Sequence, residues 1–191
     1  EYEARHLRTA YSGFLKLDLY EATIRNGSHS VEVVREVHDH GHGAAVLPYD
    51  AARRTALLVR QLRVPVHVVE GDGLLLEAAA GVIDPADPSP MDAARREARE
   101  ELGYELHDLT PVITFYPIPG LVTERMHCFL ARYTPADRLE GDTGADDDEV
   151  LDVEEWPLKE LWAAMGDGRL KDGKAIICLY ALRLAQPELF A

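Results

Sequence analysis

A single helical segment stands among strands in this sequence and limits the folds that the chain can adopt. From about Met91 to Leu102 the residues are mainly alanine, arginine and glutamate, none is β-branched, and Gly103 follows as a stop signal. Short runs of alternating apolar and polar residues precede it as far as Gly81 and predict strands. The order of strands, helix, strands and helices predicts an α+β protein with a mixed sheet and argues against a doubly wound repeat.

Alternation and turn residues place the expected elements. A hairpin is predicted to join Phe14–Ile24 to Val31–Val37 through the turn at residues 25–28. Further strands are expected at Ala44–Tyr49, Ala56–Leu62, Leu74–Ala80, Val112–Tyr116, Met126–Tyr133 and Val150–Val153, and further helices at Leu158–Met165 and Ala175–Leu184. Asp172 is expected to cap the last helix, with an apolar stripe formed by Ile176, Leu179, Tyr180 and Leu184.

The net charge of the chain limits the kinds of molecule that it can bind. Its 191 residues contain 20 Lys and Arg against 34 Asp and Glu, a net charge of −14, which predicts repulsion from nucleic acid and from anionic membranes. An anionic small substrate would need local basic residues or metal ions. No apolar run approaches the roughly 20 residues that span a bilayer.

The two cysteines, Cys128 and Cys178, are far apart in sequence and show neither a CxxC spacing nor a disulfide pattern. Each lies in an apolar stretch and is expected to be a buried small hydrophobe. The first residues show neither the basic nor the apolar region of a signal peptide. These features lead us to expect a cytoplasmic protein.

Three carboxylates crowd together on the central helix. Glu97 and Glu101 are four residues apart and lie on one face, with Glu100 beside them. Such a cluster repels itself unless cations neutralise it, and Mg²⁺ prefers oxygen ligands of this kind. Arg96 can pair with one carboxylate and orient it. A solvated surface helix with ordinary ion pairs is the alternative interpretation of the same pattern.

The stretch Arg96–Tyr104 resembles the second half of the Nudix box, whose pattern is G-x5-E-x7-R-E-U-x-E-E-x-G-U with U apolar. The first half departs from it, because one extra residue lies between Gly81 and Arg96 and Asp87 is the nearest stand-in for the first glutamate. The resemblance implies a Nudix fold, a mixed sheet between helices, with an N-terminal antiparallel β element. It also implies a dimer-forming segment at 1–42 and a Nudix hydrolase domain at 43–191.

Further segments resemble the branch of the family that contains the ADP-ribose and GDP-mannose pyrophosphatases. They are Arg35–Val37, Val59–Arg63, Glu77–Gly81, Pro119–Gly120, Thr123–Glu124 and the acidic loop before Glu149. The segment Lys171–Lys174 is similar to the GDP-mannose enzymes in particular. The implied reaction is Mg²⁺-dependent hydrolysis of a nucleoside diphosphate sugar to a nucleoside monophosphate and a sugar phosphate, with Mn²⁺ as a substitute ion.

The resemblance also implies roles for individual residues. The metal ligands would be the Ala80 carbonyl and the carboxylates of Glu97, Glu100, Glu101 and Glu149. Glu149 would be the general base, with Asp148 as the alternative, and Glu100, Glu101 and Arg96 would complete the catalytic set. The implied substrate contacts are Arg63, Glu124 and Lys174 and, from the partner subunit of a homodimer, Arg35 and Glu36.

Several alternatives stay open at this point. The substrate-binding residues could be ordinary surface side chains, and Lys174 could be a solvated residue of a first helical turn. The whole chain could be an inactive Nudix-like nucleotide-binding regulator or an acidic interaction module. His38, His40 and His42 alternate and could bind a transition metal, although a polar loop beside the subunit contact is the preferred interpretation. The nucleobase and the sugar are not specified by these residues.

Overall fold

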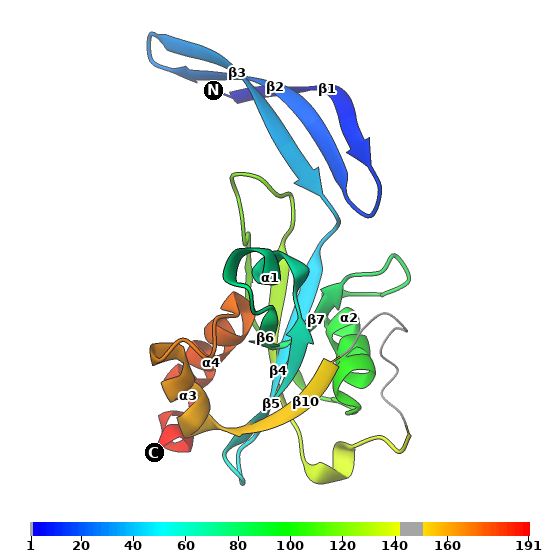
Figure 1. Cartoon of the computed structure of the whole chain (residues 1–191), viewed down its shortest axis with the longest axis vertical. Helices are drawn as coiled ribbons and strands as arrows, with labels where there is room; N and C mark the ends of the chain where they lie inside the picture. The colour runs from blue at the N-terminus through cyan, green and yellow to red at the C-terminus, as the bar shows by residue number, and fades with distance from the viewer. Residues whose placement is uncertain (1, 142–150) are drawn as a thin grey trace. The chain divides into compact units, whose positions relative to one another are not determined.

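The structure is a computed structural model, and it describes residues 2–141 and 151–191 (Figure 1). The chain divides into two compact units. The first comprises Glu1–His42 and Phe115–Met126, and the second comprises Gly43–Thr114 and His127–Ala191.

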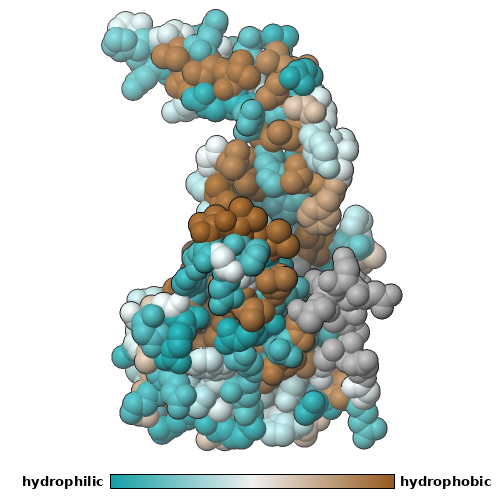
Figure 2. All heavy atoms as spheres, in the orientation of Figure 1, coloured by the Kyte–Doolittle hydropathy of each residue, from teal (hydrophilic) through white to brown (hydrophobic). Residues whose placement is uncertain are grey.

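The first unit is built on a three-stranded antiparallel sheet of β1 (Tyr2–Ser12), β2 (Lys16–Asn26) and β3 (His29–Asp39). The predicted hairpin is confirmed, since β2 pairs with β3 across a turn in which Gly27 has a φ of 61°. The first strand was not predicted, because its charged residues blur the alternation. Many apolar side chains of this sheet are exposed, as Figure 2 shows.

A buried carboxylate fastens β1 to β2. Asp18 is 5% exposed and accepts hydrogen bonds from the Thr9 hydroxyl at 2.6 Å, with Lys16 Nζ at 2.7 Å and His6 at 3.1 Å. The hydrogen bonds from Lys16 and Thr9 hold the pKa of Asp18 well below its usual range. These polar contacts link β1 to β2 in a stretch where their pairing shifts register, between His6 and Arg8 and between Thr9 and Tyr11.

The second unit contains a seven-stranded sheet with the order β10-β5-β4-β9-β8, in which β6 pairs with β5 and β7 with β4. Its strands are β4 (Gly43–Asp50), β5 (Thr55–Leu62), β6 (Leu74–Glu77), β7 (Ala79–Val82), β8 (Leu109–Phe115), β9 (Met126–Arg132) and β10 (Leu151–Pro157). Helix α1 (Val64–Glu70) follows β5 and buries none of its residues. That helix was not predicted, because its valines favour a strand.

The predicted strand Leu74–Ala80 is broken in two, which corrects the prediction. Up to Glu77 the chain pairs with β5, and from Ala79 it pairs with β4, so the partner changes at Ala78. The segment therefore lies between β4 and β5, which pair with each other only at their far ends. Pro48, which has no N–H to donate, falls where β4 changes its partner from β7 to β5.

The central helix begins as α2 (Pro90–Glu97) and continues as a π-helical turn, η1 (Ala98–Leu102). The Ser89 hydroxyl caps its start by accepting the Asp92 N–H at 3.2 Å. Gly103 ends it with a φ of 71°, as predicted. The change to a π-helical turn was not predicted, and such turns often occur at functional sites.

Alanines pack this helix closely against the sheet. Ala93, Ala94 and Ala98 are fully buried against small residues of β4 and β7, including Ala44 and Ala79. The absence of long side chains lets the helix backbone approach the strands closely. This close packing also brings the carboxylates of the helix beside these strands.

The other face of the sheet is covered by α3 (Leu158–Gly166) and α4 (Gly173–Ala185), as Figure 1 shows. Asp172 caps α4 as predicted. The predicted apolar stripe is wrong, because Tyr180 and Leu184 are exposed. The buried stripe of this uniformly apolar helix consists of Ala175, Cys178, Leu179 and Leu182. Cys128 and Cys178 are free and buried, as expected.

The fold is α+β, with a mixed sheet between helices and a separate N-terminal antiparallel sheet, which confirms the predicted class. Two 3₁₀ turns, η2 (Pro135–Asp137) and η3 (Pro187–Phe190), complete the described elements. None of the helices in the described ranges is long and apolar enough to cross a membrane.

The close packing of the α2 alanines against the sheet can be tested by introducing a larger side chain. We expect Ala94→Leu to lower the free energy of unfolding by about 1–3 kcal/mol, because the added carbons have no space between helix and sheet. Ala163→Leu, at an exposed position of α3, is the matched control and should change it by less than about 0.5 kcal/mol. Urea unfolding measures both, and equal effects would contradict the close-packing argument.

Candidate active site

Two carboxylates of the central helix converge on one short piece of backbone. Glu101, 2% exposed, accepts the N–H of Ala80 at 3.0 Å. Glu97, 8% exposed, lies against the next residue, Gly81. Carboxylates this buried are rare on surface helices, so the solvated-helix alternative fails for these two residues.

Gly81 is required by this close approach. A Cβ added there would lie 2.0 Å from Oε1 of Glu97 and 2.6 Å from Oε2. Both distances are far below van der Waals contact, so the carboxylate occupies the space that any larger residue would fill. The glycine at the start of the box therefore has a steric role here.

Arg96 organises the rest of the cluster. Its Nη1 lies 2.7 Å from Glu97 and 2.8 Å from Glu100, while its Nη2 lies 3.1 Å from Asp87 and donates to the Val82 carbonyl. The hydrogen bond between Arg96 and Asp87 lowers the pKa of Asp87 and raises the pKa of Arg96. Asp87 thus forms an ion pair with Arg96. Asp87 itself lies in the loop that contains the extra residue of the motif.

The donor set suits a hard cation. Glu101 and Glu97 offer carboxylate oxygens beside Ala80 and Gly81, and Glu100 is linked to Glu97 through Arg96. Carboxylate oxygens are the ligands that Mg²⁺ prefers. Among the described residues, no three His, Cys, Asp or Glu side chains are gathered so that they could hold a metal ion on their own. A bound ion would therefore need further oxygens from water, from substrate or from residues outside the described ranges.

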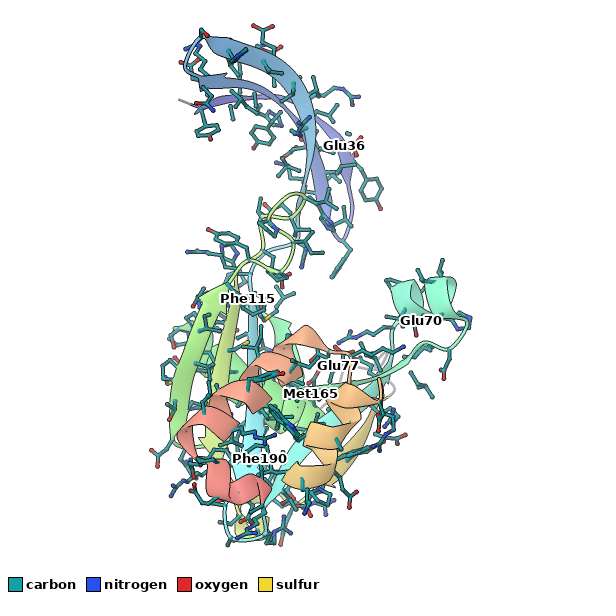
Figure 3. The ribbon with its side chains drawn as sticks, turned by 90° about the vertical axis from the view of Figure 1, so that its left-hand side faces the viewer. Glu36, Glu70, Glu77, Phe115, Met165 and Phe190 are labelled. Atoms are coloured by element: carbon teal, nitrogen blue, oxygen red, sulfur yellow. The ribbon has the colours of Figure 1, made fainter. Side chains whose placement is uncertain are left out.

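A second cluster lies at the other end of the same segment. Arg63 follows β5 and forms a bidentate pair with Glu77, with Nε and Nη2 at 2.5 and 3.2 Å. Lys174 Nζ lies 3.0 Å from Glu77 and 2.7 Å from Asp172. Glu77, labelled in Figure 3, thus lies beside the first turn of α4. The structure brings the predicted contacts Arg63 and Lys174 together around a carboxylate.

Lys174 is not a solvated side chain of a first helical turn, which excludes that alternative. Its side chain is 18% exposed and lies between two carboxylates. Burial lowers the pKa of Lys174, but the charges of Asp172 and Glu77 outweigh it and raise the pKa overall. The amine is therefore held charged at neutral pH.

The remaining predicted substrate residues lie in the first unit. Arg35 and Glu36 are on β3 and line a cavity of about 510 Å³ with Tyr116 and the loop Pro119–Thr123. Glu124 is in the same unit, with Oε2 3.7 Å from His40 Nε2. The structure does not bring these three residues together with Glu97 and Glu101 in one unit.

The three histidines are separated by their contacts. His42 Nδ1 accepts the N–H of Arg125 at 3.2 Å, whereas the rings of His38 and His40 are tilted by 53° with their centroids 5.1 Å apart. In the part of the chain that the structure describes, His38 Nε2 and His40 Nδ1 are buried without a hydrogen-bond partner. They are not part of a metal cluster of three or more residues there.

Glu149, the predicted base and metal ligand, and its alternative Asp148 lie outside the described residues. Their roles stay predictions.

The profile of the NUDIX domain family matches residues 39–176, which is most of the chain. The chain belongs to the Nudix family. The match spans the central helix, Gly81 beside Glu97 and both carboxylate clusters.

Two curated relatives extend the comparison. The chain is 43% identical over 155 residues to the GDP-mannose pyrophosphatase of Yersinia enterocolitica serotype O:8 / biotype 1B, covering 81% of this chain and 79% of the relative. It is 42% identical over 162 residues to the GDP-mannose pyrophosphatase of Pectobacterium atrosepticum, covering 84% and 82%. The resemblance to this branch is confirmed.

The chain is therefore a Nudix hydrolase, of a family that generally uses a divalent metal ion. The inactive nucleotide-binding module is not favoured, because the relatives are enzymes and Glu97, Glu100 and Glu101 are all present.

Sequence reasoning did not identify Glu77 as a site residue and assigned Asp172 only a capping role. Glu77 had one local signal, a carboxylate at the end of the apolar run Leu74–Leu76. A charge that ends such a run is often buried and paired. Its partners Arg63 and Lys174 are distant in sequence, so the network itself could not be predicted.

The steric role of Gly81 gives a direct prediction. Gly81→Ala would push the Glu97 carboxylate away by more than an ångström, and a displacement of that size can cost roughly a hundredfold in turnover. We expect kcat/KM with Mg²⁺ to fall by about that factor, and half-maximal activity to require more Mg²⁺. Metal titrations of initial rates measure both quantities.

Gly166→Ala is the matched control, because a Cβ there meets nothing within 4 Å. It should retain wild-type kinetics. A Gly81→Ala enzyme with unchanged Mg²⁺ dependence would show that the position of Glu97 does not matter for metal use.

Proposed function

We propose that this Nudix hydrolase cleaves the diphosphate of a nucleoside diphosphate sugar in the presence of Mg²⁺. Its products would be a nucleoside monophosphate and a sugar phosphate. GDP-mannose is the first candidate because the similar curated proteins are named for it, and ADP-ribose is the second. The free buried thiols of Cys128 and Cys178 fit a reducing cytoplasm as its compartment.

The observation that supports this proposal is the convergence of Glu97 and Glu101 on the backbone of Ala80 and Gly81. Two oriented carboxylates beside one strand form half of an oxygen-lined metal site. A diphosphate supplies further oxygens of the same chemistry. Such a substrate would therefore supply some of the further oxygens that a bound ion needs.

The residues that would hold Mg²⁺, or Mn²⁺ in its place, are the Ala80 carbonyl, Glu97, Glu100, Glu101 and Glu149. When bound, the ion supplies charge neutralisation on the phosphate oxygens and polarises the attacked phosphorus and a water. Glu149 would accept the proton of that water, with Asp148 as the alternative base.

The other side chains of the site prepare it for a charged substrate. Arg96 holds Glu97 and Glu100 in place, so that the carboxylates need not reorganise during the reaction. Arg63 and Lys174 supply the positive charge that an otherwise acidic protein needs beside a diphosphate. In this proposal Glu124, Arg35 and Glu36 contact the nucleoside or the sugar.

We further propose that residues 1–42 form a dimer, with 43–191 as the hydrolase domain, so that Arg35 and Glu36 reach the partner's substrate. A three-stranded sheet needs an apolar face packed against something to be stable. In one chain, large apolar side chains of this segment stay exposed; they are Tyr2, Leu7, Tyr11, Phe14, Val31 and Val34 (Figure 2). A second copy would cover them.

The function is tested with a panel of nucleoside diphosphate sugars and identification of the products. We expect GMP and mannose 1-phosphate from GDP-mannose in Mg²⁺, and none after chelation. Glu101→Gln keeps the size of the side chain and removes its charge, so turnover should fall at least about a hundredfold.

Near-wild-type turnover of Glu101→Gln on both GDP-mannose and ADP-ribose would place the metal elsewhere. Glu149→Gln and Asp148→Asn separate the two candidate bases, since the larger loss of kcat marks the base. Tight nucleotide binding without hydrolysis in either ion would instead favour the regulatory module.

The dimer is tested by sedimentation equilibrium. Val31 and Val34 have opposite parity on β3 and so point to opposite faces of the sheet. We expect a dimer in the wild type, and monomers in whichever of Val31→Asp or Val34→Asp alters the covered face. His29→Asp, at the exposed start of β3, should leave the dimer intact. A monomeric wild type at micromolar concentrations would contradict the proposal.

A further inference from the structure

We infer that Glu77 is a positioning residue for substrate binding, and that it acts by holding the guanidinium of Arg63 in one orientation. The inference rests on the proposed function, in which Arg63 contacts the nucleoside diphosphate sugar. Glu77 is assigned a positioning role because both of its oxygens accept hydrogen bonds from Arg63 or Lys174.

The geometry separates the two cations that share Glu77. Arg63 uses both Nε and Nη2 on the two oxygens of Glu77, at 2.5 and 3.2 Å. A bidentate pair of this kind fixes the plane of the guanidinium as well as its position. Lys174 makes one contact with Glu77 at 3.0 Å and a closer one with Asp172 at 2.7 Å. Glu77 therefore fixes the orientation of the Arg63 guanidinium, whereas it holds Lys174 at a single point.

Arg63 is only partly covered. Its side chain is 37% exposed, while the carboxylate that fixes two of its nitrogens is buried. This arrangement suits recognition of an anionic or carbonyl group, because the cation is preorganised before the ligand arrives.

Asp172 anchors the group to the rest of the site. Its Oδ2 accepts the N–H of Ala78 at 3.1 Å and that of Ala175 at 3.1 Å, while its Oδ1 meets Lys174. Ala78 is the next residue after Glu77 and two before Ala80, which bonds to Glu101. The position of Arg63 is therefore set by the same backbone that sets the metal-binding carboxylates.

The test is a double-mutant cycle read as KM and kcat separately. We expect Glu77→Gln to raise KM for the preferred nucleoside diphosphate sugar about tenfold and to change kcat less than about twofold. Arg63→Gln should raise KM by at least as much. If Glu77 acts through Arg63, the double variant should match Arg63→Gln within about twofold. Additive losses would overturn the inference, since they would mean separate roles.

Glu154→Gln is the matched control. Glu154 forms the same kind of bidentate pair with Arg60, at 2.5 and 3.1 Å, on neighbouring strands of the same sheet. Removing that pair should leave KM unchanged. A rise in KM equal to that of Glu77→Gln would show that any broken ion pair in the sheet has this effect, and would also overturn the inference.

A second variant covers the case in which Glu77→Gln does not fold. Arg63→Lys leaves the buried carboxylate paired with a charge but removes the fork of donors. We expect its KM to rise nearly as much as that of Arg63→Gln, and a wild-type KM would overturn the inference. If the wild type hydrolyses no such substrate, the proposed function fails by itself, and the same cycle read as Kd for GDP-mannose by calorimetry still decides the role of Glu77.

Discussion

The site depends on the satisfaction of two backbone N–H groups by carboxylates. Where the chain passes from β6 to β7 it leaves one sheet partner for another, and the N–H groups of Ala78 and Ala80 bond to Asp172 and Glu101. Each bond ties a helix to the strand, α4 in the first case and the central helix in the second. The cluster of Glu97 and Glu101 and the cluster around Glu77 are thereby fixed to one short segment, as a preorganised site requires.

An acidic protein that binds an anion must concentrate its few cations. Here Arg63, Arg96 and Lys174 each lie against buried or half-buried carboxylates. The carboxylates lower the net charge of each cluster, but they also hold the cations in fixed directions. A long-range positive potential is not needed when the groups that meet the substrate are already aligned.

Local patterns in the sequence predicted the helix, its glycine stop, the pairing of β2 with β3 and the common face of Glu97 and Glu101, because each depends on neighbours in the chain. The stripe of α4 could not be chosen, since apolar residues surround the whole helix. The contact of Glu77 with Lys174 joins residues 97 positions apart, and the break at Ala78 depends on pairing with two other strands. No local pattern encodes either feature. The box motif indicated candidate site residues, and the structure adds that Gly81 lies against Glu97 and that Asp87 pairs with Arg96.

The contact between Gly81 and Glu97 makes these two positions a single unit of variation. With Glu97 in place, even the smallest side chain at position 81 would collide with its carboxylate. A chain with a shorter residue at position 97 would leave the space of the missing carboxylate empty beside β7, where water could enter. Neither position can change alone without cost, so an engineer who wishes to move the Glu97 carboxylate must redesign the strand and the helix together.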